Sequence, residues 1–176
     1  MRVIAGELRS RRLKTLPGLA TRPTPDRLRE TLFNVLAPVI VDSMFLDAYA
    51  GTGAVGIEAL SRGARRCVFV EKKRPAVEVI RQNLASLGLV DRAEVYAGKA
   101  IAVLERVSAD IVFLDPPYDL EKEYEAALNT LGASTNKLVI AQHSSRAALQ
   151  PEYGTLLRYR VLKQGDNSLS FYRSAS

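Results

Sequence analysis

The stretch that decides the fold runs from residue 46 to residue 56 and reads LDAYAGTGAVG. It begins as the end of an apolar strand, passes glycines at positions 51, 53 and 56, and continues into a helical pattern. Glycines at this spacing allow a tight turn and a close approach of backbone to a ligand. The spacing alone is weak evidence, because dinucleotide enzymes share it and glycines can simply permit close strand–helix packing. The stretch therefore predicts a strand–loop–helix unit that can hold a ligand.

Short apolar runs alternate with helical stretches from Met44 onward. The runs that predict strands are Met44–Ala50, Cys67–Glu71, Glu94–Ala97, Ile111–Asp115 and Leu138–Gln142, and the helices expected between them cover 54–62, 75–87, 100–107 and 121–131. This alternation predicts an α/β, Rossmann-like fold with a mostly parallel sheet and helices on both faces. The tail differs, because Leu156–Leu162 and Ser168–Arg173 flank Gly165-Asp166-Asn167 and predict an antiparallel hairpin.

The chain of 176 residues is expected to form a single domain, 1–176, with a basic extension over 1–38 and the α/β core over 44–176. In the extension Thr24 is predicted to cap a helix that starts at Pro25 and ends near Pro38. An apolar stripe marks the buried side of that helix, formed by Leu28, Leu32, Val35 and Leu36.

The composition excludes several classes of protein. The one cysteine, Cys67, rules out an internal disulfide and a cysteine-built metal site, and we expect it to be buried packing. No apolar stretch approaches the ~20 residues that span a bilayer. We expect a cytoplasmic, metal-independent monomer.

The net charge of +6 is concentrated, because residues 1–30 hold eight basic and three acidic side chains. A localised basic segment suits phosphate backbones, although a solvated basic face would look the same. Arg27 and Arg29 could equally pair with Asp26 or Glu30. The residues predicted to contact nucleic acid are Arg9, Arg11, Arg12, Arg22, Arg27, Arg29 and Asn34.

Two acids distinguish between possible cofactors. Asp47 stands at the end of the first strand, where a carboxylate would repel a pyrophosphate but attract the ammonium of a methionine moiety. Glu71 ends the next strand, where an acid can accept both ribose hydroxyls. The alternatives are a helix-terminus charge for Asp47 and a solvated strand end for Glu71. Together the acids favour S-adenosylmethionine over a nicotinamide.

A third cofactor contact departs from the pattern of similar methyltransferases, which often carry an acid after the third strand. Lys99 occupies that region and cannot accept a hydrogen bond from the adenine amino group. A backbone carbonyl, another side chain or water would have to accept it. The predicted cofactor site comprises Asp47, Tyr49, Gly51, Thr52, Gly53, Gly56, Glu71, Lys72, Lys99, Ala100 and Asp115.

The fourth strand ends in Asp115-Pro116-Pro117-Tyr118. Successive prolines lack backbone N–H groups, so they must turn out of the sheet. The amine of an aromatic base is a poor nucleophile, and the Asp115 carboxylate and Pro116 carbonyl can accept its hydrogens and aim its lone pair at a sulfonium methyl. Tyr118 can stack on the base. All four residues are predicted to be catalytic, whereas the alternative is a turn with a core aromatic.

These motifs resemble the bacterial 16S ribosomal RNA guanine-N2 methyltransferases. The resemblance covers most of the chain and rests on four segments: Arg2–Gly6, Arg22–Asn34, Leu46–Gly63 and Asp115–Tyr118. It implies seven strands with the last one antiparallel, an Arg22–Asn34 segment bordering the cleft, and a guanine of 16S ribosomal RNA or of a small-subunit particle as substrate. Gln142-His143 departs from the pattern, which has an acid near the histidine, and His143 is expected to be structural rather than to touch substrate.

Two other readings stay open. Asp-Pro-Pro-Tyr also occurs in adenine-N6 DNA methyltransferases, although nothing in the chain looks like a separate sequence-reading domain. A non-catalytic RNA-binding assembly factor would be expected to carry degraded motifs, and both the glycine loop and the tetrapeptide are intact.

Overall fold

A computed structural model of the chain describes residues 1–17, 24–117, 121–134 and 138–174, and every structural statement below concerns these residues. One eight-stranded sheet forms the centre, in the order β3-β2-β1-β4-β5-β8-β7-β6. Its strands are β1 (Met44–Asp47), β2 (Arg66–Glu71), β3 (Ala93–Ala97), β4 (Ile111–Leu114), β5 (Leu138–Ser144), β6 (Glu152–Tyr153), β7 (Leu156–Gln164) and β8 (Asn167–Ser174). The predicted α/β fold and strand alternation are confirmed.

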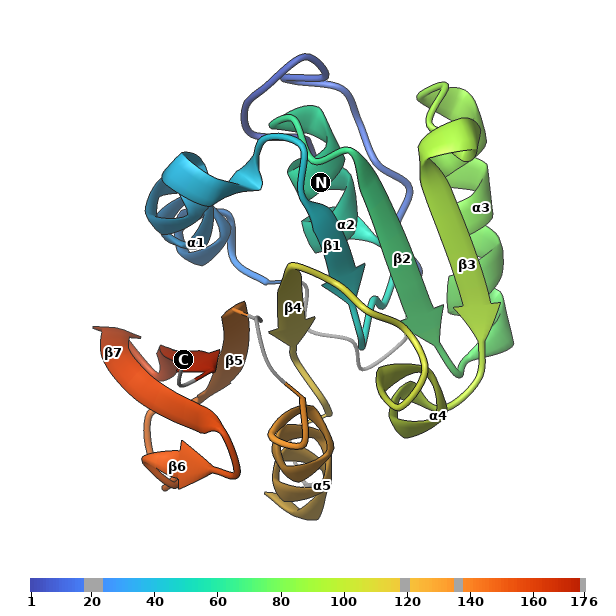
Figure 1. Ribbon diagram of the computed structural model, residues 1–176. Helices are drawn as coiled ribbons and strands as arrows, with labels where there is room; N and C mark the ends of the chain where they lie inside the picture. Colours follow the sequence, from blue (N-terminus) through green and yellow to red (C-terminus); the bar gives the residue numbers. More distant parts are fainter. Residues whose placement is uncertain (18–23, 118–120, 135–137, 175–176) are drawn as a thin grey trace.

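The first five strands run parallel, so their carboxyl ends meet at one edge, which lies at the bottom of Figure 1. The other three strands are antiparallel to their neighbours. β7 and β8 are the predicted hairpin. The resemblance implied seven strands, and the eighth is the two-residue β6, whose length is too short to show as a sequence pattern.

Helices cover both faces of the sheet. They are α1 (Asp26–Ile40), α2 (Ala54–Ser61), α3 (Arg74–Ser86), α4 (Ala100–Leu104) and α5 (Glu121–Leu131), with a short 3-10 turn, η1 (Val90–Arg92). Neighbouring strand residues point to opposite faces. Thus Phe45 packs into the core under α1, α2 and α3, whereas Leu46 packs into the core under α4 and α5.

Helix α1 differs from its prediction at both ends. It starts at Asp26, and Thr24 does not cap it, because the Thr24 hydroxyl instead donates to Oε1 of Gln142 in β5 at 3.3 Å. The helix continues past Pro38 to Ile40. The predicted apolar stripe is correct: Leu28, Leu32 and Leu36 are buried, and Val35 packs partly against the same core.

The N-terminal residues dock on the end of α2 that lies farthest from the carboxyl edge (Figure 1). Glu58 of α2 is fully buried and accepts hydrogen bonds from the backbone N–H groups of Ile4 and Ala5 at 2.8 and 3.0 Å and from Nε of Arg62 at 2.8 Å. Gly6 has φ +87°, and a Cβ on it would lie 2.0 Å from the Ser61 carbonyl oxygen. This close contact fixes the segment at the amino ends of the strands.

Among the helices of the described ranges, none combines the length and the apolar character that crossing a membrane requires.

Candidate active site

Two acidic side chains lie at the carboxyl ends of neighbouring strands. β1 and β4 pair directly, with Asp47 opposite Phe113, and the backbone N–H of Ala48 donates to the Phe113 carbonyl at 3.1 Å. Asp115 is the first residue after the end of β4. The parallel pairing therefore brings the glycine-loop strand and the tetrapeptide strand to the same edge, as the sequence predicted.

The glycine loop crosses from β1 to α2 with two residues in the left-handed region. Gly51 has φ +58° and Gly53 has φ +91°, conformations that strain any residue with a Cβ. A Cβ built on Gly51 would meet no atom within 4 Å, so this glycine is required by the backbone and its outer side is open. The loop is held by the Ala50 N–H, which donates to the Val70 carbonyl at 2.9 Å. The open side leaves room for a ligand to approach the loop.

Gly56, in contrast, allows α2 to pack closely against β2. A Cβ there would lie 2.3 Å from the ring of Phe69 and 2.8 Å from Sγ of Cys67, both on β2. Its backbone N–H already donates to Oδ2 of Asp47 at 2.9 Å. The predicted cofactor contact at Gly56 is wrong, because close helix–strand packing uses this glycine. The prediction that Cys67 is buried is confirmed.

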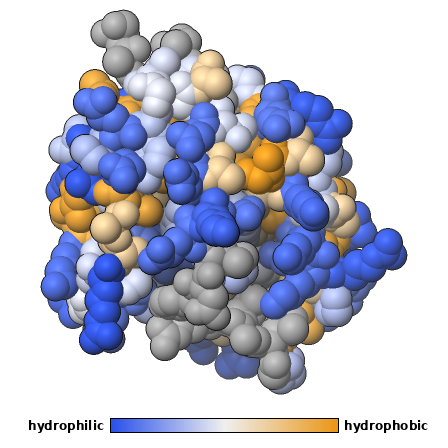
Figure 2. All heavy atoms as spheres, turned by 90° about the horizontal axis from the view of Figure 1, so that it is seen from below, coloured by the Kyte–Doolittle hydropathy of each residue, from blue (hydrophilic) through white to orange (hydrophobic). Residues whose placement is uncertain are grey.

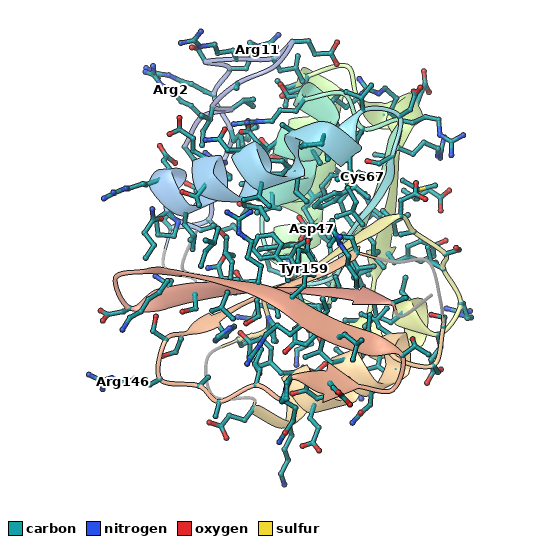
Figure 3. The ribbon with its side chains drawn as sticks, turned by 60° about the vertical axis from the view of Figure 1, so that its left-hand side comes forward. Arg2, Arg11, Asp47, Cys67, Arg146 and Tyr159 are labelled. Carbon is teal, nitrogen blue, oxygen red and sulfur yellow. The ribbon has the colours of Figure 1, made fainter. Side chains whose placement is uncertain are left out.

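Asp47 is almost fully buried, with 1% of its surface exposed. Burial raises its pKa to about 7; the hydrogen bond from Gly56 opposes this shift, and the nearby charge of Glu71 adds to it. The Asp47 carboxylate thus accepts a hydrogen bond from the first turn of α2, which agrees with the alternative role as a charge at a helix terminus. Its location at the edge, marked in Figure 3, is also compatible with attraction of a cationic ligand.

Asp115 follows β4 in a half-buried position, and Pro116 behind it is buried. Burial, together with the nearby charge of Asp47, raises the pKa of Asp115 to about 8. Within the described residues no hydrogen bond reaches the Asp115 carboxylate. Pro117 is exposed, and Tyr118 lies outside the described residues. The site therefore contains a carboxylate whose burial is not compensated by donors from the described protein.

Glu71 bonds to the backbone around the glycine loop. Its Oε2 accepts from the N–H of Gly51 at 2.9 Å and its Oε1 accepts from the N–H of Lys73 at 3.1 Å. Each oxygen keeps a second lone pair that can accept a hydroxyl. Lys72 between them is exposed. Glu71 therefore lies beside the loop, as predicted, and is not a merely solvated strand end.

Two contacts around the loop were missed by sequence reasoning. The Tyr49 hydroxyl donates to Oε1 of Glu123 in α5 at 2.8 Å, and burial followed by this hydrogen bond raises the Tyr49 pKa. Asn83 of α3 is buried, and its Nδ2 donates to the carbonyls of Lys14 and Thr52 at 3.1 and 3.2 Å. Neither Asn83 nor Glu123 belongs to a local motif, so no signal in the sequence identifies them.

The predicted adenine-side residues lie where α4 begins. Ala100 is the first residue of this helix and is buried, whereas Lys99 is exposed before it. The N–H of Gly98 donates to the Glu71 carbonyl at 3.0 Å, which ties this turn to the end of β2. The structure thus brings Lys99 and Ala100 near the glycine-loop side of the edge.

The predicted nucleic-acid contacts are dispersed. Arg9, Arg11 and Arg12 are exposed but belong to the N-terminal segment at the opposite end of the strands, where Arg11 is seen in Figure 3. Nη2 of Arg11 donates to the carbonyl of Ser86, at the end of α3, at 3.1 Å. These three arginines therefore do not line the edge that holds Asp115. Arg22 lies outside the described residues.

On α1, Arg27 and Asn34 are exposed as predicted, but Arg29 is fully buried. Its Nη2 donates to the Arg2 carbonyl at 2.7 Å and to Oδ1 of Asp26 at 3.0 Å. The expectation that Arg29 contacts nucleic acid or cofactor is wrong, because its guanidinium anchors the N-terminal segment to α1. The alternative, pairing with Asp26, is confirmed.

His143 is buried between β5 and β8. Its Nδ1 lies 2.8 Å from the Ser144 carbonyl oxygen and its Nε2 lies 2.7 Å from Oγ of Ser170. Burial lowers its pKa. Both ring nitrogens therefore have protein partners, as expected of a structural histidine. No group of three or more potential metal-binding side chains occurs in the described ranges.

The charges at the carboxyl edge fit S-adenosylmethionine better than a phosphate-bearing cofactor. Asp47, Glu71 and Asp115 give the edge three carboxyl groups, which would oppose phosphates and favour a sulfonium and an ammonium. The open side of Gly51 provides the approach. Figure 2, which looks onto this edge, shows a surface that is mostly hydrophilic around it.

Comparison with known proteins agrees with this geometry. The sequence model of a family described as conserved hypothetical protein 95 matches residues 1–173. The chain is 34% identical to the Bacillus subtilis protein named "Putative rRNA methyltransferase YlbH", over 98% of each chain. It is 36% identical to ribosomal RNA small subunit methyltransferase D of Haemophilus influenzae, over 92% of this chain and 88% of that one. The solved structure of "Putative methyltransferase yhhF" from Escherichia coli superposes with a TM-score of 0.86 at 35% identity, covering 99% of this chain and 98% of that chain.

Proposed function

Because the chain belongs to the family described as conserved hypothetical protein 95 and has the class I methyltransferase fold, we propose that it transfers a methyl group to small-subunit ribosomal RNA. The observation that carries this proposal is the pairing of β1 with β4, which puts Asp115 and Pro116 beside Asp47 and the glycine loop. The names of its relatives support ribosomal RNA as the substrate.

We further propose that the methylated atom is the exocyclic N2 of a guanine. The Asp115 carboxylate and the Pro116 carbonyl accept the two amine hydrogens, which helps the nitrogen rehybridise and directs its lone pair at the methyl donor. Burial around Asp115 strengthens this interaction, because charge stabilisation is larger in a site that excludes water. Tyr118 stacks on the extruded base in this proposal.

S-adenosylmethionine, when bound, supplies an electrophilic methyl group on a sulfonium. Glu71, already aligned by the N–H groups of Gly51 and Lys73, accepts the ribose hydroxyls with its remaining lone pairs. Asp47 attracts the ammonium group, directly or through water. Neither role requires a metal or a covalent intermediate.

The test is methyl incorporation by the purified protein from labelled S-adenosylmethionine into 16S ribosomal RNA, into small-subunit particles and into duplex DNA, followed by nucleoside identification. N2-methylguanosine in the RNA is the expected product. N6-methyladenine in DNA would overturn both the RNA and the guanine assignment, and binding without incorporation into any substrate would support a non-catalytic assembly factor.

A further inference from the structure

The C-terminal hairpin carries a second concentration of positive charge. Residues 156–174 contain four basic side chains, Arg158, Arg160, Lys163 and Arg173, against one acid, Asp166. Residues 1–30 and this hairpin together carry more net positive charge than the whole chain, so the remaining residues are slightly acidic.

An aromatic–arginine pair lies on this hairpin. The register of β7 against β8 shifts between Arg158 and Arg160, so that Tyr159 is an extra residue without a partner in β8. Its side chain is 42% exposed, and the Arg173 guanidinium lies 4.1 Å from its ring centroid. The Tyr159 ring also contacts Phe171, with centroids 6.2 Å apart. The buried Phe171 thus supports an ordered aromatic–cation platform at the surface.

The edge of the sheet beside this pair is open. β6 pairs with β7 only at Leu156 and Leu157, so the rest of β7 has no strand on its outer side within the described residues. Arg160 and Lys163 are exposed, and neither they nor Arg173 forms an ion pair or a hydrogen bond there. Two cations, Arg160 and Arg173, are therefore unneutralised on the face that carries Tyr159, whereas Lys163 pairs with Ser168 and points to the other face of the sheet. Arg158 differs, because its Nη1 donates to the Leu149 carbonyl at 3.3 Å.

The hairpin connects this platform to the candidate active site. The hairpin turn lies at the active-site edge, because Ser168 pairs with Lys163 and with His143 near the carboxyl end of β5, whereas Arg173 pairs with Leu138 at the amino end of β5. From Lys163 to Tyr159 the strand covers roughly 13 Å. Tyr159 lies on the side of the sheet that α1 covers (Figure 3), since its ring contacts Phe171 of the core under α1.

We propose that the face of the β7–β8 hairpin that carries Tyr159 is a second RNA-contact surface, in which Arg160 binds a phosphate and the Tyr159–Arg173 pair stacks on an unpaired base. This inference rests on the proposed function, because it assumes an RNA substrate. Arginine planes and aromatic rings are the usual stacking partners of splayed RNA bases. The hairpin that carries the surface reaches the active-site edge with its turn, so in this proposal the surface orients the RNA while Asp115 acts on the base.

A protein strand pairing with the open edge of β7 is the other candidate occupant. Exposed Leu157 and Val161 on the same edge would suit it. The charge favours RNA, because the unneutralised cations of Arg160 and Arg173 beside the exposed Tyr159 ring attract phosphates. RNA is therefore the occupant that the surface favours.

The test compares the full chain with two variants, Tyr159→Ala and the double variant Arg160→Gln/Arg173→Gln. We expect each to weaken binding of protein-free 16S ribosomal RNA by about tenfold and to raise the KM for RNA while kcat and S-adenosylmethionine affinity stay unchanged. The double variant is also expected to lower the salt dependence of log affinity by about 0.7, the contribution of one phosphate-bound cation on single-stranded RNA. Tyr159→Phe should retain binding, since stacking does not need the hydroxyl.

The matched control is Arg65→Gln/Arg106→Gln, which removes the same charge from two exposed arginines, one directly before β2 and one after the carboxyl end of α4. An equal loss of RNA affinity in the control, or full RNA affinity in the hairpin variants, would overturn the proposed RNA-contact surface. A loss seen only with protein-containing subunits would assign the edge to a protein instead. If the wild-type protein methylates no RNA, the proposed function fails; if it does and the hairpin variants bind normally, only this inference fails.

Discussion

Buried carboxyl groups occur at both ends of the sheet, and their surroundings differ. At the amino ends, Glu58 is fully buried and accepts three hydrogen bonds, from two backbone N–H groups and from Arg62. At the carboxyl ends, Asp47 accepts one hydrogen bond, and Asp115 accepts none from the described residues. The first arrangement stabilises a charged carboxylate within the fold. The second leaves acceptor sites open at the edge where a ligand can approach.

The difference separates a structural acid from the acids that we propose to be functional. Burying a carboxylate costs several kcal/mol unless donors compensate it, so an uncompensated acid persists only where something other than stability maintains it. The pKa values of about 7 and about 8 for Asp47 and Asp115 express this cost. Completeness of hydrogen bonding, rather than burial, therefore distinguishes the proposed reactive edge from the other end of the sheet.

The largest effect is expected at the structural acid. Glu58→Ala removes the acceptor for three donors and leaves Arg62 without its partner, so we expect the free energy of unfolding to fall by about 3–5 kcal/mol. Urea denaturation measures this loss. Methyl transfer per folded molecule should change little. Glu78→Ala, an exposed glutamate of α3, is the matched control and is expected to shift stability by less than about 0.5 kcal/mol.

At Asp115, the acid proposed to act in catalysis, we expect a smaller change in free energy than at Glu58 but a larger loss of activity. Asp115→Asn removes the negative charge that stabilises the reacting amine, so we expect methyl transfer to fall at least ~100-fold, about 2.7 kcal/mol of transition-state stabilisation, while calorimetry still detects cofactor binding. Asp110→Asn at the other end of β4 is the control and should retain activity, since Asp110 accepts only from the Met44 N–H. Unchanged turnover in Asp115→Asn would mean that other groups accept the amine hydrogens.

Much of the fold could be predicted from the sequence, because periodicity and turn chemistry are local. Every core strand and helix was located correctly, with ends that differ by a few residues. Errors occurred where tertiary contacts override local preference. Thr24 bonds to Gln142 rather than capping α1, and Gly56 packs against Phe69 rather than contacting a ligand.

The candidate site was predictable only in part for the same reason. Asp47 and Asp115 are found by their place after the strands, since parallel strands bring their ends together. The placement of Arg9, Arg11 and Arg12 at the opposite end depends on the docking of the N-terminal segment on Glu58, a contact between residues more than 50 positions apart. No pattern within either segment encodes that contact.

The pH dependence of stability provides a further test of the contrast. A carboxyl group whose pKa is raised on folding binds a proton more tightly in the folded state, so its contribution to stability declines as pH rises toward the folded pKa. We expect the melting temperature of the ligand-free protein to fall between pH 6.5 and about 8, through Asp47 and Asp115. His143, whose pKa is lowered by burial, acts in the opposite direction, and only below its ordinary pKa of 6.5.

Asp115→Asn should flatten this decline and melt higher than the wild type at pH 8, because the amide has no charge to bury. Differential scanning calorimetry at matched ionic strength measures both curves. A wild-type melting temperature that is constant over this range, or an Asp115→Asn curve parallel to it, would show that the described burial does not disfavour the ionised acid.

The smallest effect is expected at Arg29, which is buried like Glu58 but incompletely bonded. Its Nη2 has two acceptors, yet Nε and Nη1 have none among the described residues. Removing one partner of a buried ion pair is costly where it leaves the other charge buried, but Asp26 is largely exposed, so the hydrogen bonds lost with Arg29 are offset by the desolvation that is no longer needed. Arg29→Met is therefore expected to change the free energy of unfolding by less than about 1 kcal/mol, measured by urea denaturation beside Glu58→Ala. A loss as large as that of Glu58→Ala would mean that burial alone, and not the number of satisfied bonds, determines what a charged side chain contributes at this end of the molecule.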